Sequence, residues 1–202
     1  MQLSELEPVL TRALGRAAPA SSDFDLNTDF VPPPGRKLRP AAVLVPVIDG
    51  TEGAEVLLTK RSSRLKHHPG QIAFPGGKVD EGDASIEAAA HREAWEEIGL
   101  PLGSARIIGT LPTHETVTSF TMTSFVGIVD APFVPVPEAG EVAEVFSVPF
   151  AHLSNPAMFK VERRRWQGRW RHYYTVPFGP YYIWGATARI LRSLAEVMQQ
   201  ER

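Results

Sequence analysis

Three glutamates lie within five positions near the middle of the chain, directly after an arginine. Glu93, Glu96 and Glu97 are spaced i, i+3 and i+4, so a helix would project all three carboxylates from one face. Like charges at these spacings destabilise a helix by roughly 0.2–0.5 kcal/mol per pair, and a solvated acidic face is the plain explanation for such a cluster. The neighbouring positions carry alanines where a solvated helix would carry compensating lysines, which favours a functional role.

A hard divalent cation would relieve this repulsion. Magnesium or manganese prefers oxygen ligands and retains water, so two or three carboxylates and a backbone carbonyl suit it. Such an ion would bridge to substrate phosphates and neutralise charge that develops there. Arg92 precedes the acids and could orient one of them through a bidentate pair. The residue types alone therefore predict a magnesium-dependent site for a phosphorylated ligand.

A glycine turn and a helix are the elements that must position these acids. The Pro-Gly-Gly turn at 75–77 precedes them, and glycine permits close approach of the backbone to another group. Helical pattern begins near Ser85, with Asp83 as a second N-cap candidate and Gly99 as the expected stop. We expect one apolar row at i, i+4 to face the core: Ile86, Ala90, Ala94 and Ile98.

The remaining periodicity predicts a mixed α+β domain. Apolar runs predict strands at 41–48 and 54–61, joined by a turn at 49–54, and further strands at 105–111, 121–130 and 141–150. A hairpin over 160–176 would turn at Gln167-Gly168, and a closing helix would follow over 185–200. The domain would have a largely β body, one acid-rich helix after the second strand and a terminal helix.

The first 38 residues follow a different pattern. Leu3, Leu6, Leu10 and Leu14 recur at helical spacing and predict a short amphipathic helix. Residues 17–37 are rich in Pro, Ser and Asp without periodicity, which predicts a connector arm. We therefore divide the chain into an N-terminal helix and arm, 1–38, and a main domain, 39–202. The arm and helix could cover the core or mediate dimer contacts.

Composition excludes several classes of protein. The 202 residues are 43% hydrophobic and 22% charged, as expected of a globular domain, and the net charge of −2 argues against nucleic-acid or membrane partners. The absence of cysteine excludes disulfides, thiolate catalysis and zinc–cysteine sites. No apolar run is long enough for a membrane span, and Glu5 and Glu7 argue against a mitochondrial presequence. We expect a cytoplasmic monomer or homodimer that acts on a small molecule.

The stretch "GGKVDEGDASIEAAAHREAWEEIGL" (76–100) resembles the signature of the Nudix hydrolases. That signature is a glycine, five residues, a glutamate, seven residues, Arg-Glu, an apolar residue, any residue, Glu-Glu, any residue, a glycine and an apolar residue. The matching positions are Gly77, Arg92, Glu93, Ala94, Glu96, Glu97, Gly99 and Leu100. Asp83 stands where the first glutamate is expected, and eight residues separate it from Arg92. Because this insertion precedes the Arg-Glu pair, the spacing of the later carboxylates should survive.

An upstream stretch, "LLTKRSSRLKHHPGQIAFPGG" (57–77), resembles the extra motif of the coenzyme A diphosphatase branch of the Nudix family. Lys66 replaces the second arginine of that motif, which keeps the charge but loses the planar two-pronged donor. The segment "YYIWGATARIL" (181–191) is also similar to that branch. The residues that the resemblance assigns to substrate binding are Arg61, Ser62, Lys66, Gly70, Phe74 and Gly76.

The resemblance implies a Nudix α/β/α sandwich over residues 39–202 and cleavage of coenzyme A, or an acyl derivative, to adenosine 3′,5′-bisphosphate and 4′-phosphopantetheine. It implies Mg²⁺ or Mn²⁺ as cofactor, held by Glu93, Glu96, Glu97 and the Gly77 carbonyl. Arg92 and an outlying acid would complete the catalytic set, and Glu144 is favoured over Glu141 as that acid. One of the glutamates would act as general base, and spacing does not select which.

Three alternatives remain open at this point. The chain could hydrolyse another nucleoside diphosphate derivative, such as ADP-ribose or a dinucleotide, or it could be a Nudix-fold module that binds a ligand without turnover. The stretch "ERRRWQGRWR" (162–171) could bind an adenine ring or single-stranded nucleic acid. Alternation in a hairpin would instead place arginines on a solvated face and tryptophans against the body. If the stretch is functional, an arginine near a substrate 3′-phosphate is favoured.

Overall fold

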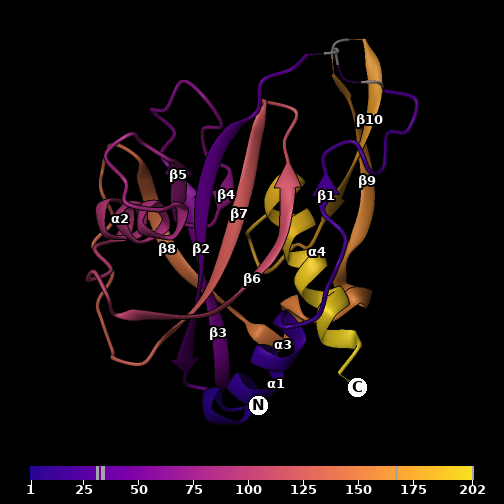
Figure 1. Ribbon diagram of the computed structural model, residues 1–202. Coiled ribbons are helices and arrows are strands. Elements are labelled where there is room, and N and C mark those ends of the chain that lie inside the picture. Colours follow the sequence, from indigo (N-terminus) through magenta and orange to yellow (C-terminus); the bar gives the residue numbers. More distant parts are fainter. Residues whose placement is uncertain (31, 33–34, 167, 202) are drawn as a thin grey trace.

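A mixed β-sheet lies at the centre of the molecule (Figure 1). The structure is a computed structural model, and it describes residues 1–30, 32, 35–166 and 168–201. Within these residues the sheet has eight strands, and two further strands form a separate hairpin. The elements in chain order are α1 (Leu3–Leu14), β1 (Ser21–Ser22), β2 (Arg39–Gly50), β3 (Gly53–Arg61), β4 (Ile72–Ala73), β5 (Gly76–Lys78), α2 (Ile86–Ile98), β6 (Ala105–Glu115), β7 (Phe120–Val129), β8 (Val142–Pro149), α3 (Phe150–Leu153), a 3₁₀ turn (Pro156–Met158), β9 (Lys160–Trp166), β10 (Arg169–Thr175) and α4 (Gly185–Gln199).

Strand β2 organises the sheet. It pairs in parallel with β7 from Arg39↔Phe120 to Ile48↔Val129, and it pairs antiparallel with β3 through the predicted turn. The sheet runs in the order β1-β6-β7-β2-β3-β4, while β5 adds to β2 and β8 adds to β3. The parallel and antiparallel pairs together make the sheet mixed, as the sequence predicted.

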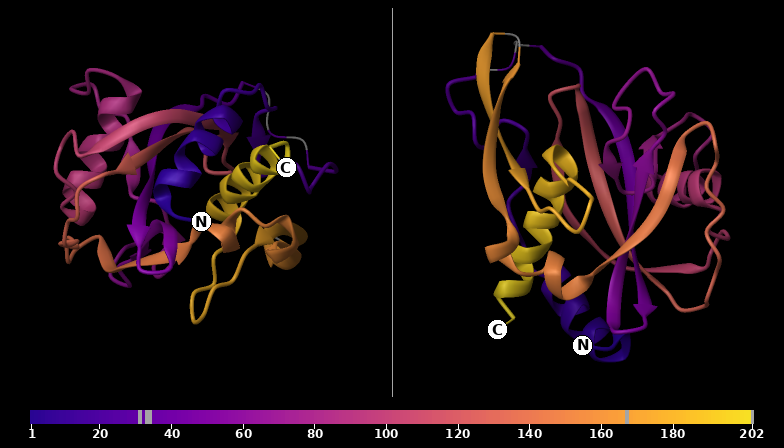
Figure 2. Two further views of the ribbon diagram at one scale, coloured as in Figure 1. Left: turned by 90° about the horizontal axis from the view of Figure 1, so that it is seen from below. Right: turned by 180° about the vertical axis from the view of Figure 1, so that it is seen from behind.

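Helices cover both faces of the sheet because the side chains of β2 alternate between two hydrophobic clusters. Val43, Val45 and Val47 belong to a larger cluster that also contains residues of α1 and α4. Ala42 and Leu44 point the other way, into a smaller cluster with the buried residues of α2. Figure 2 shows α2 on one side of the sheet and α4 with the β9–β10 hairpin on the other. The α/β/α sandwich is therefore confirmed.

Helix α2 has the predicted ends and most of the predicted apolar row. The Ser85 side chain accepts a hydrogen bond from the Ala88 N–H at 3.0 Å, and Gly99 ends the helix in the left-handed conformation at φ 70°. Within the row, Ala90, Ala94 and Ile98 are fully buried. The prediction is wrong for Ile86, which remains 41% exposed because it begins the helix, one turn before the first buried alanines.

The N-terminal segment joins the same core. Leu3, Leu6 and Leu10 are buried in the larger cluster, which confirms the amphipathic helix and shows that α1 covers the core. Strand β1, in the arm, then pairs in parallel with the end of β6, with Ser21 opposite His114. Among the described residues, no helix is long and apolar enough to cross a membrane.

The predicted hairpin is present, but one of its tryptophans is not where we expected it. Strands β9 and β10 pair antiparallel, and Gly168 has the positive φ of a tight turn, while Gln167 lies outside the described residues. Trp170 is 51% exposed, so the prediction that the tryptophans pack against the body is wrong for this residue. The guanidinium of Arg163 lies 4.6 Å from the centre of the Trp170 ring and covers it in place of the body.

Candidate active site

The Pro-Gly-Gly segment, called the glycine turn here, lies directly beneath the acids of α2. The predicted turn is wrong for Gly76 and Gly77, because they pair with β2 as part of strand β5. Gly77 pairs with Ala42 of β2, and a Cβ atom placed on Gly77 would lie 2.5 Å from Oε1 of Glu93. Gly76 has φ 155°, and a Cβ atom there would collide with the backbone carbonyl of Ala42. Gly76 is required because backbone blocks a side chain there, whereas at Gly77 a side chain would have to displace the carboxylate of Glu93. The Gly-Gly pair therefore sets the distance between the turn and the carboxylate of Glu93.

Arg92 gathers the acids around its guanidinium group. Its Nε and Nη2 atoms bind the two carboxylate oxygens of Asp83 at 2.8 and 3.0 Å. Its Nη1 atom donates to Glu93 at 3.0 Å and to Glu96 at 3.0 Å. Nη2 also donates to the Lys78 carbonyl at 3.1 Å, which ties α2 to the glycine turn. The predicted bidentate pair thus exists, but its partner is Asp83, whose pKa these hydrogen bonds lower to about 2.

Glu97 is the most deeply placed of the three glutamates, with 3% of its surface exposed. Its Oε2 atom accepts a hydrogen bond from the Gly76 N–H at 3.1 Å, and Nη1 of Arg61 lies 3.8 Å from its Oε1 atom. Burial raises the pKa of Glu97 to about 7, and the charges of Glu93 and Glu141 act in the same direction. Glu97, from the signature at 76–100, and Arg61, from the upstream motif, therefore face each other across the site.

The other two glutamates of that signature, Glu93 and Glu96, differ in exposure. The side chain of Glu93 is 15% exposed, whereas that of Glu96 is 47% exposed. Burial raises the pKa of Glu93, and the charges of Glu96 and Glu141 add to the effect, although Arg92 opposes it. Glu96 thus lies at the surface of the cluster, and Glu93 and Glu97 lie deeper.

The two outlying acids have different surroundings. The charge of Glu141 raises the pKa of both Glu93 and Glu97, and its carbonyl accepts a hydrogen bond from the Ser62 N–H at 2.7 Å. Glu144 instead accepts a hydrogen bond from the hydroxyl of Tyr181. Glu141 therefore lies close enough for its charge to act on the carboxylate cluster. The side chain of Glu144 is instead bound to Tyr181, in the segment before α4.

The residues of the upstream motif separate into two groups. Arg61 ends β3 beside Glu97, and its Nε atom is buried without a hydrogen-bond partner among the described residues. Lys66 and Gly70 lie exposed on the loop between β3 and β4. Ser62 and Phe74 are buried, and Phe74 belongs to the larger hydrophobic cluster. Arg61, Lys66 and Gly70 are thus accessible to a ligand, whereas Phe74 packs the core behind the site.

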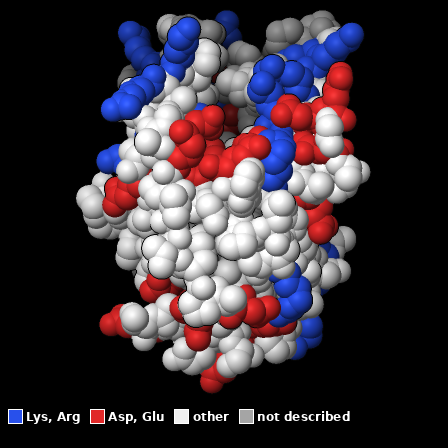
Figure 3. Space-filling view, turned by 90° about the vertical axis from the view of Figure 1, so that its left-hand side faces the viewer, with Lys and Arg blue, Asp and Glu red and all other residues white. Residues whose placement is uncertain are grey.

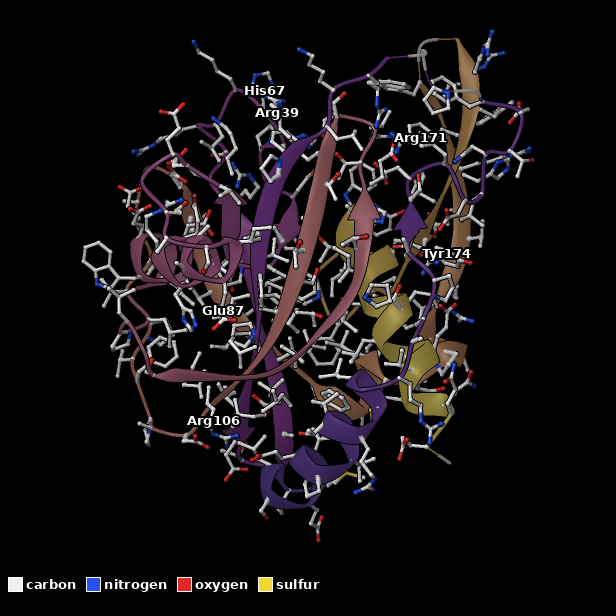
Figure 4. The ribbon with its side chains drawn as sticks, viewed as in Figure 1. Arg39, His67, Glu87, Arg106, Arg171 and Tyr174 are labelled. Carbon is white, nitrogen blue, oxygen red and sulfur yellow. The ribbon has the colours of Figure 1, made fainter. Side chains whose placement is uncertain are left out.

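Two views show the surroundings of the site. On the α2 side of the molecule, Asp and Glu side chains gather around a hollow, and Lys and Arg side chains lie above it (Figure 3). Arg39, at the start of β2, and His67, on the loop after β3, lie at the same end of the molecule (Figure 4). The acidic side chains around the hollow suit a cation, and the basic side chains above it suit an anionic ligand that contacts that cation.

The donor set fits a hard divalent cation, although the side chains of Glu93 and Glu96 are turned towards Arg92. In the described part of the chain, no group of three or more acidic or histidine side chains is already arranged to hold a metal ion. The physical reason is that Glu93 and Glu96 both converge on Nη1 of Arg92. The available donors are all oxygen atoms, and burial and mutual repulsion disfavour the charged forms of Glu93 and Glu97, which a cation would stabilise.

Comparison with known proteins gives matches over most of this chain. A sequence model of the NUDIX domain matches residues 37–169. A protein described as an uncharacterized Nudix hydrolase, NudL, from Enterobacter sp. (strain 638) is 44% identical over 161 residues, which cover 78% of this chain and 81% of that protein. A protein of the same description from Cronobacter sakazakii is 41% identical over 157 residues, with the same two coverages of 78% and 81%.

Solved structures also resemble this chain. The crystal structure of a Nudix hydrolase from M. smegmatis, RenU, is 29% identical, covers 58% of this chain and 73% of that one, and has a TM-score of 0.48. The NUDIX domain of Shewanella oneidensis NrtR, solved with ADP ribose, is 18% identical, covers 61% of this chain and 80% of that one, and has a TM-score of 0.48.

Proposed function

The chain belongs to the Nudix hydrolase family, and from this premise we propose that its substrate is coenzyme A or an acyl derivative of it. Members of the family act on diphosphate linkages and in general use divalent metal ions. For this chain we propose Mg²⁺ or Mn²⁺ as the ion. Glu93, Glu96, Glu97 and the Gly77 carbonyl would hold it.

One observation carries the choice of substrate. Arg61 belongs to the upstream motif, which generic Nudix chemistry does not need, and its guanidinium lies 3.8 Å from the buried carboxylate of Glu97. The motif that resembles the coenzyme A branch therefore faces the acids that resemble the family signature. A diphosphate bound by a cation at those acids would lie beside Arg61, whose planar group can bind phosphate oxygens in pairs.

In the proposed reaction, water attacks one phosphorus atom of the diphosphate, and the bond from that phosphorus to the bridging oxygen breaks. The bridging oxygen leaves with the other phosphate, so the products are adenosine 3′,5′-bisphosphate and 4′-phosphopantetheine, or its acyl derivative. A bound Mg²⁺ or Mn²⁺ ion supplies charge stabilisation at the diphosphate oxygens. One of the three glutamates, Glu93, Glu96 or Glu97, accepts the proton of the attacking water.

Several residues orient these groups. Arg92 holds α2 against the glycine turn and fixes Asp83, Glu93 and Glu96 around one guanidinium. Arg61 binds a phosphate of the substrate, and Lys66 offers a further positive charge from the exposed loop. We assign the outlying acid to Glu141, because its charge acts on Glu93 and Glu97. Glu144 then acts indirectly, through its hydrogen bond with the Tyr181 hydroxyl.

A substrate panel tests this proposal. Purified protein with Mg²⁺ is incubated with coenzyme A, ADP-ribose, diadenosine polyphosphates and nucleoside triphosphates, and we expect the highest kcat/KM for coenzyme A or an acyl derivative. Arg61→Lys should raise KM for coenzyme A, whereas Arg106→Lys, at an exposed arginine on β6, should not. Rapid turnover of another substrate without turnover of coenzyme A would contradict the proposal.

A further inference from the structure

A pocket of about 330 Å³ lies between the N-terminal arm and the tip of the β9–β10 hairpin. From the arm, Phe24, Asp29 and Phe30 line it, and from the hairpin, Trp166, Arg169 and Trp170 do so. This volume lies within the range of small-molecule sites, and aromatic walls with a few charged groups are typical of them. We propose that this pocket binds a purine nucleotide, with the base between the aromatic rings and the phosphate at Arg169.

The pocket is built by contacts that fix the arm to the hairpin. The side-chain amide of Asn27 accepts a hydrogen bond from the His172 N–H at 2.8 Å and donates one to the His172 carbonyl at 2.9 Å. Arg171 pairs with Asp23 at 3.0 Å, and the side chain of Asp23 is 10% exposed. Figure 4 shows Arg171 between the hairpin and the arm. Both walls are therefore held in place before a ligand enters, which lowers the ordering cost of binding.

The walls fit a flat ring. Phe24 and Phe30 stack with their ring centres 5.2 Å apart and their planes 5° apart, so the two rings lie parallel on the arm side of the pocket. Trp170 is 51% exposed even with the guanidinium of Arg163 over its ring, although burial of a tryptophan gives more stability than exposure. Stacking of a base on such rings is favourable and does not depend on hydrogen bonds to a particular base edge.

The charges at the pocket favour an anion attached to that ring. Arg171 is neutralised by Asp23, but among the described residues no carboxylate pairs with Arg169. Exposed Arg163, Arg164 and Arg165 on β9 add positive charge at the same end of the hairpin. Asp29, on the opposite wall, offers a carboxylate to the hydroxyl groups of a ribose. A base, a sugar and a phosphate together satisfy these three kinds of group.

This pocket is separate from the carboxylate cluster. The hairpin packs against α4, which covers the opposite face of the sheet from α2. Figure 1 shows α2 at the left of the sheet and the hairpin at the right. The nucleotide site is thus a second site, and it does not depend on the proposed diphosphatase reaction.

Calorimetric titration with ADP tests the proposal. The full chain is titrated in the presence of EDTA, so that no metal-dependent turnover occurs, and we expect saturable binding. Trp170→Ala and Arg169→Gln should each weaken binding at least about tenfold, since base stacking and a charged contact are each lost. Both side chains are exposed, so these variants should keep the thermal stability of the parent protein.

Matched controls separate this site from the other one. Trp95→Ala removes a tryptophan that is 53% exposed on α2, and it should leave ADP affinity unchanged. Glu97→Gln should also leave it unchanged, whatever its effect on hydrolysis. Adenosine should bind more weakly than ADP, and inorganic phosphate should not compete with ADP at equal concentration.

Four results would overturn the proposal. They are the absence of ADP binding by the parent protein, affinity that Trp170→Ala and Arg169→Gln leave unchanged, affinity that Glu97→Gln abolishes, and equal competition by phosphate. Single-stranded oligonucleotides whose affinity rises with length while ADP fails to bind would show a nucleic-acid surface instead.

Discussion

At the scale of single residues, the carboxylates of α2 oppose the stability of the fold. Glu97 is 3% exposed, and burial and the neighbouring acids raise its pKa to about 7, which means that the surroundings disfavour its charge. Arg92 offsets part of the repulsion through Glu93 and Glu96, whereas the positive charge beside Glu97 is that of Arg61, 3.8 Å away. Such an arrangement suits a group that is stabilised when a cation and a phosphorylated ligand bind.

Glu97→Gln tests this role directly. A glutamine keeps the shape and can still accept the Gly76 N–H, but it cannot supply the charge, so we expect kcat to fall by at least about a hundredfold, as outer-shell changes at metal sites already cost 10–100-fold. The melting temperature without metal should not fall. Steady-state kinetics and a thermal melt measure both effects.

Glu87→Gln is the matched control for that prediction, because Glu87 is exposed on the first turn of the same helix (Figure 4). It should leave kcat within about twofold of the parent value, as expected of a surface change. If Glu97→Gln retained the parent rate, Glu97 would have no place in the catalytic set.

Sequence reasoning found the acids of this site but not all of their partners. The i, i+3, i+4 spacing placed Glu93, Glu96 and Glu97 together because a helix makes that geometry local. The approach of Glu141 to them depends on how β8 pairs with β3, and no local pattern records that pairing. The same holds for Arg61 beside Glu97, which belong to different elements.

At the scale of elements, the glycine turn sets the approach of β5 to α2. Gly77→Ala would place a methyl group 2.5 Å from Oε1 of Glu93, so Glu93 must move. We expect activity to fall at least about tenfold, as with other displaced groups at metal sites. Gly82→Ala, in the connection from β5 to α2 and with nothing within 4 Å of its Cβ position, should retain full activity. Equal rates for the two variants would contradict the importance of this close approach.

Helix α1 should contribute to stability, since its leucines lie in the larger hydrophobic cluster. Leu10 is fully buried, and Leu10→Ala should lower the free energy of unfolding by about 2–5 kcal/mol through lost burial and the cavity left behind. Leu102→Ala, at a leucine that is 65% exposed, should change it by less than about 0.5 kcal/mol. Urea denaturation measures both, and a small effect at Leu10 would show that α1 is a detachable segment.

The sequence predicted most elements because their periodicity is local. The five long strands of the sheet, both ends of α2 and the amphipathic α1 followed from alternation, caps and leucine spacing, whereas the short strands β4 and β5 were not predicted. Strand β1 was missed, because its two residues form a strand only through pairing with β6, about ninety residues away. The exposure of Trp170 was also missed, since arginine side chains cover its ring where alternation predicted the body.

At the scale of the whole molecule, one buried carboxylate connects the arm, the sheet and the hairpin. Asp23 lies 3.5 Å from Nε2 of His114 on β6, pairs with Arg171 on β10 at 3.0 Å and accepts the Val117 N–H at 2.8 Å. Burial raises the pKa of Asp23, but the neighbouring His114 ring, the charge of Arg171 and the Val117 N–H outweigh it, so the pKa lies below its ordinary value. Asp23 is therefore charged in the folded protein and stabilises the junction.

The stability of this junction should depend on pH. Because the folded-state pKa of Asp23 lies below the unfolded value of about 3.9, its contribution is fully present above that value and is lost as pH falls through the folded-state pKa. At pH 7, Asp23→Asn should destabilise the protein by roughly 2–3 kcal/mol, or about 4–12 °C in melting temperature. The difference from the parent protein should shrink as pH falls below about 4.

Asp49→Asn, at an exposed aspartate near the end of β2, is the control and should change the melting temperature little at any pH. Thermal melts across the pH range measure both variants. A destabilisation by Asp23→Asn that stays constant down to pH 2 would show that the charge of Asp23 is not what stabilises the junction.

The identity of the products formed from coenzyme A tests the proposed reaction most directly. Chromatography with mass detection, with Mg²⁺ and again with EDTA, would follow the parent protein and Glu97→Gln. We predict equimolar adenosine 3′,5′-bisphosphate and 4′-phosphopantetheine from the parent protein with Mg²⁺, and neither product with EDTA or from Glu97→Gln at the same enzyme concentration. Intact coenzyme A after prolonged incubation with the parent protein and Mg²⁺, or release of orthophosphate in place of the two phosphomonoesters, would contradict the account.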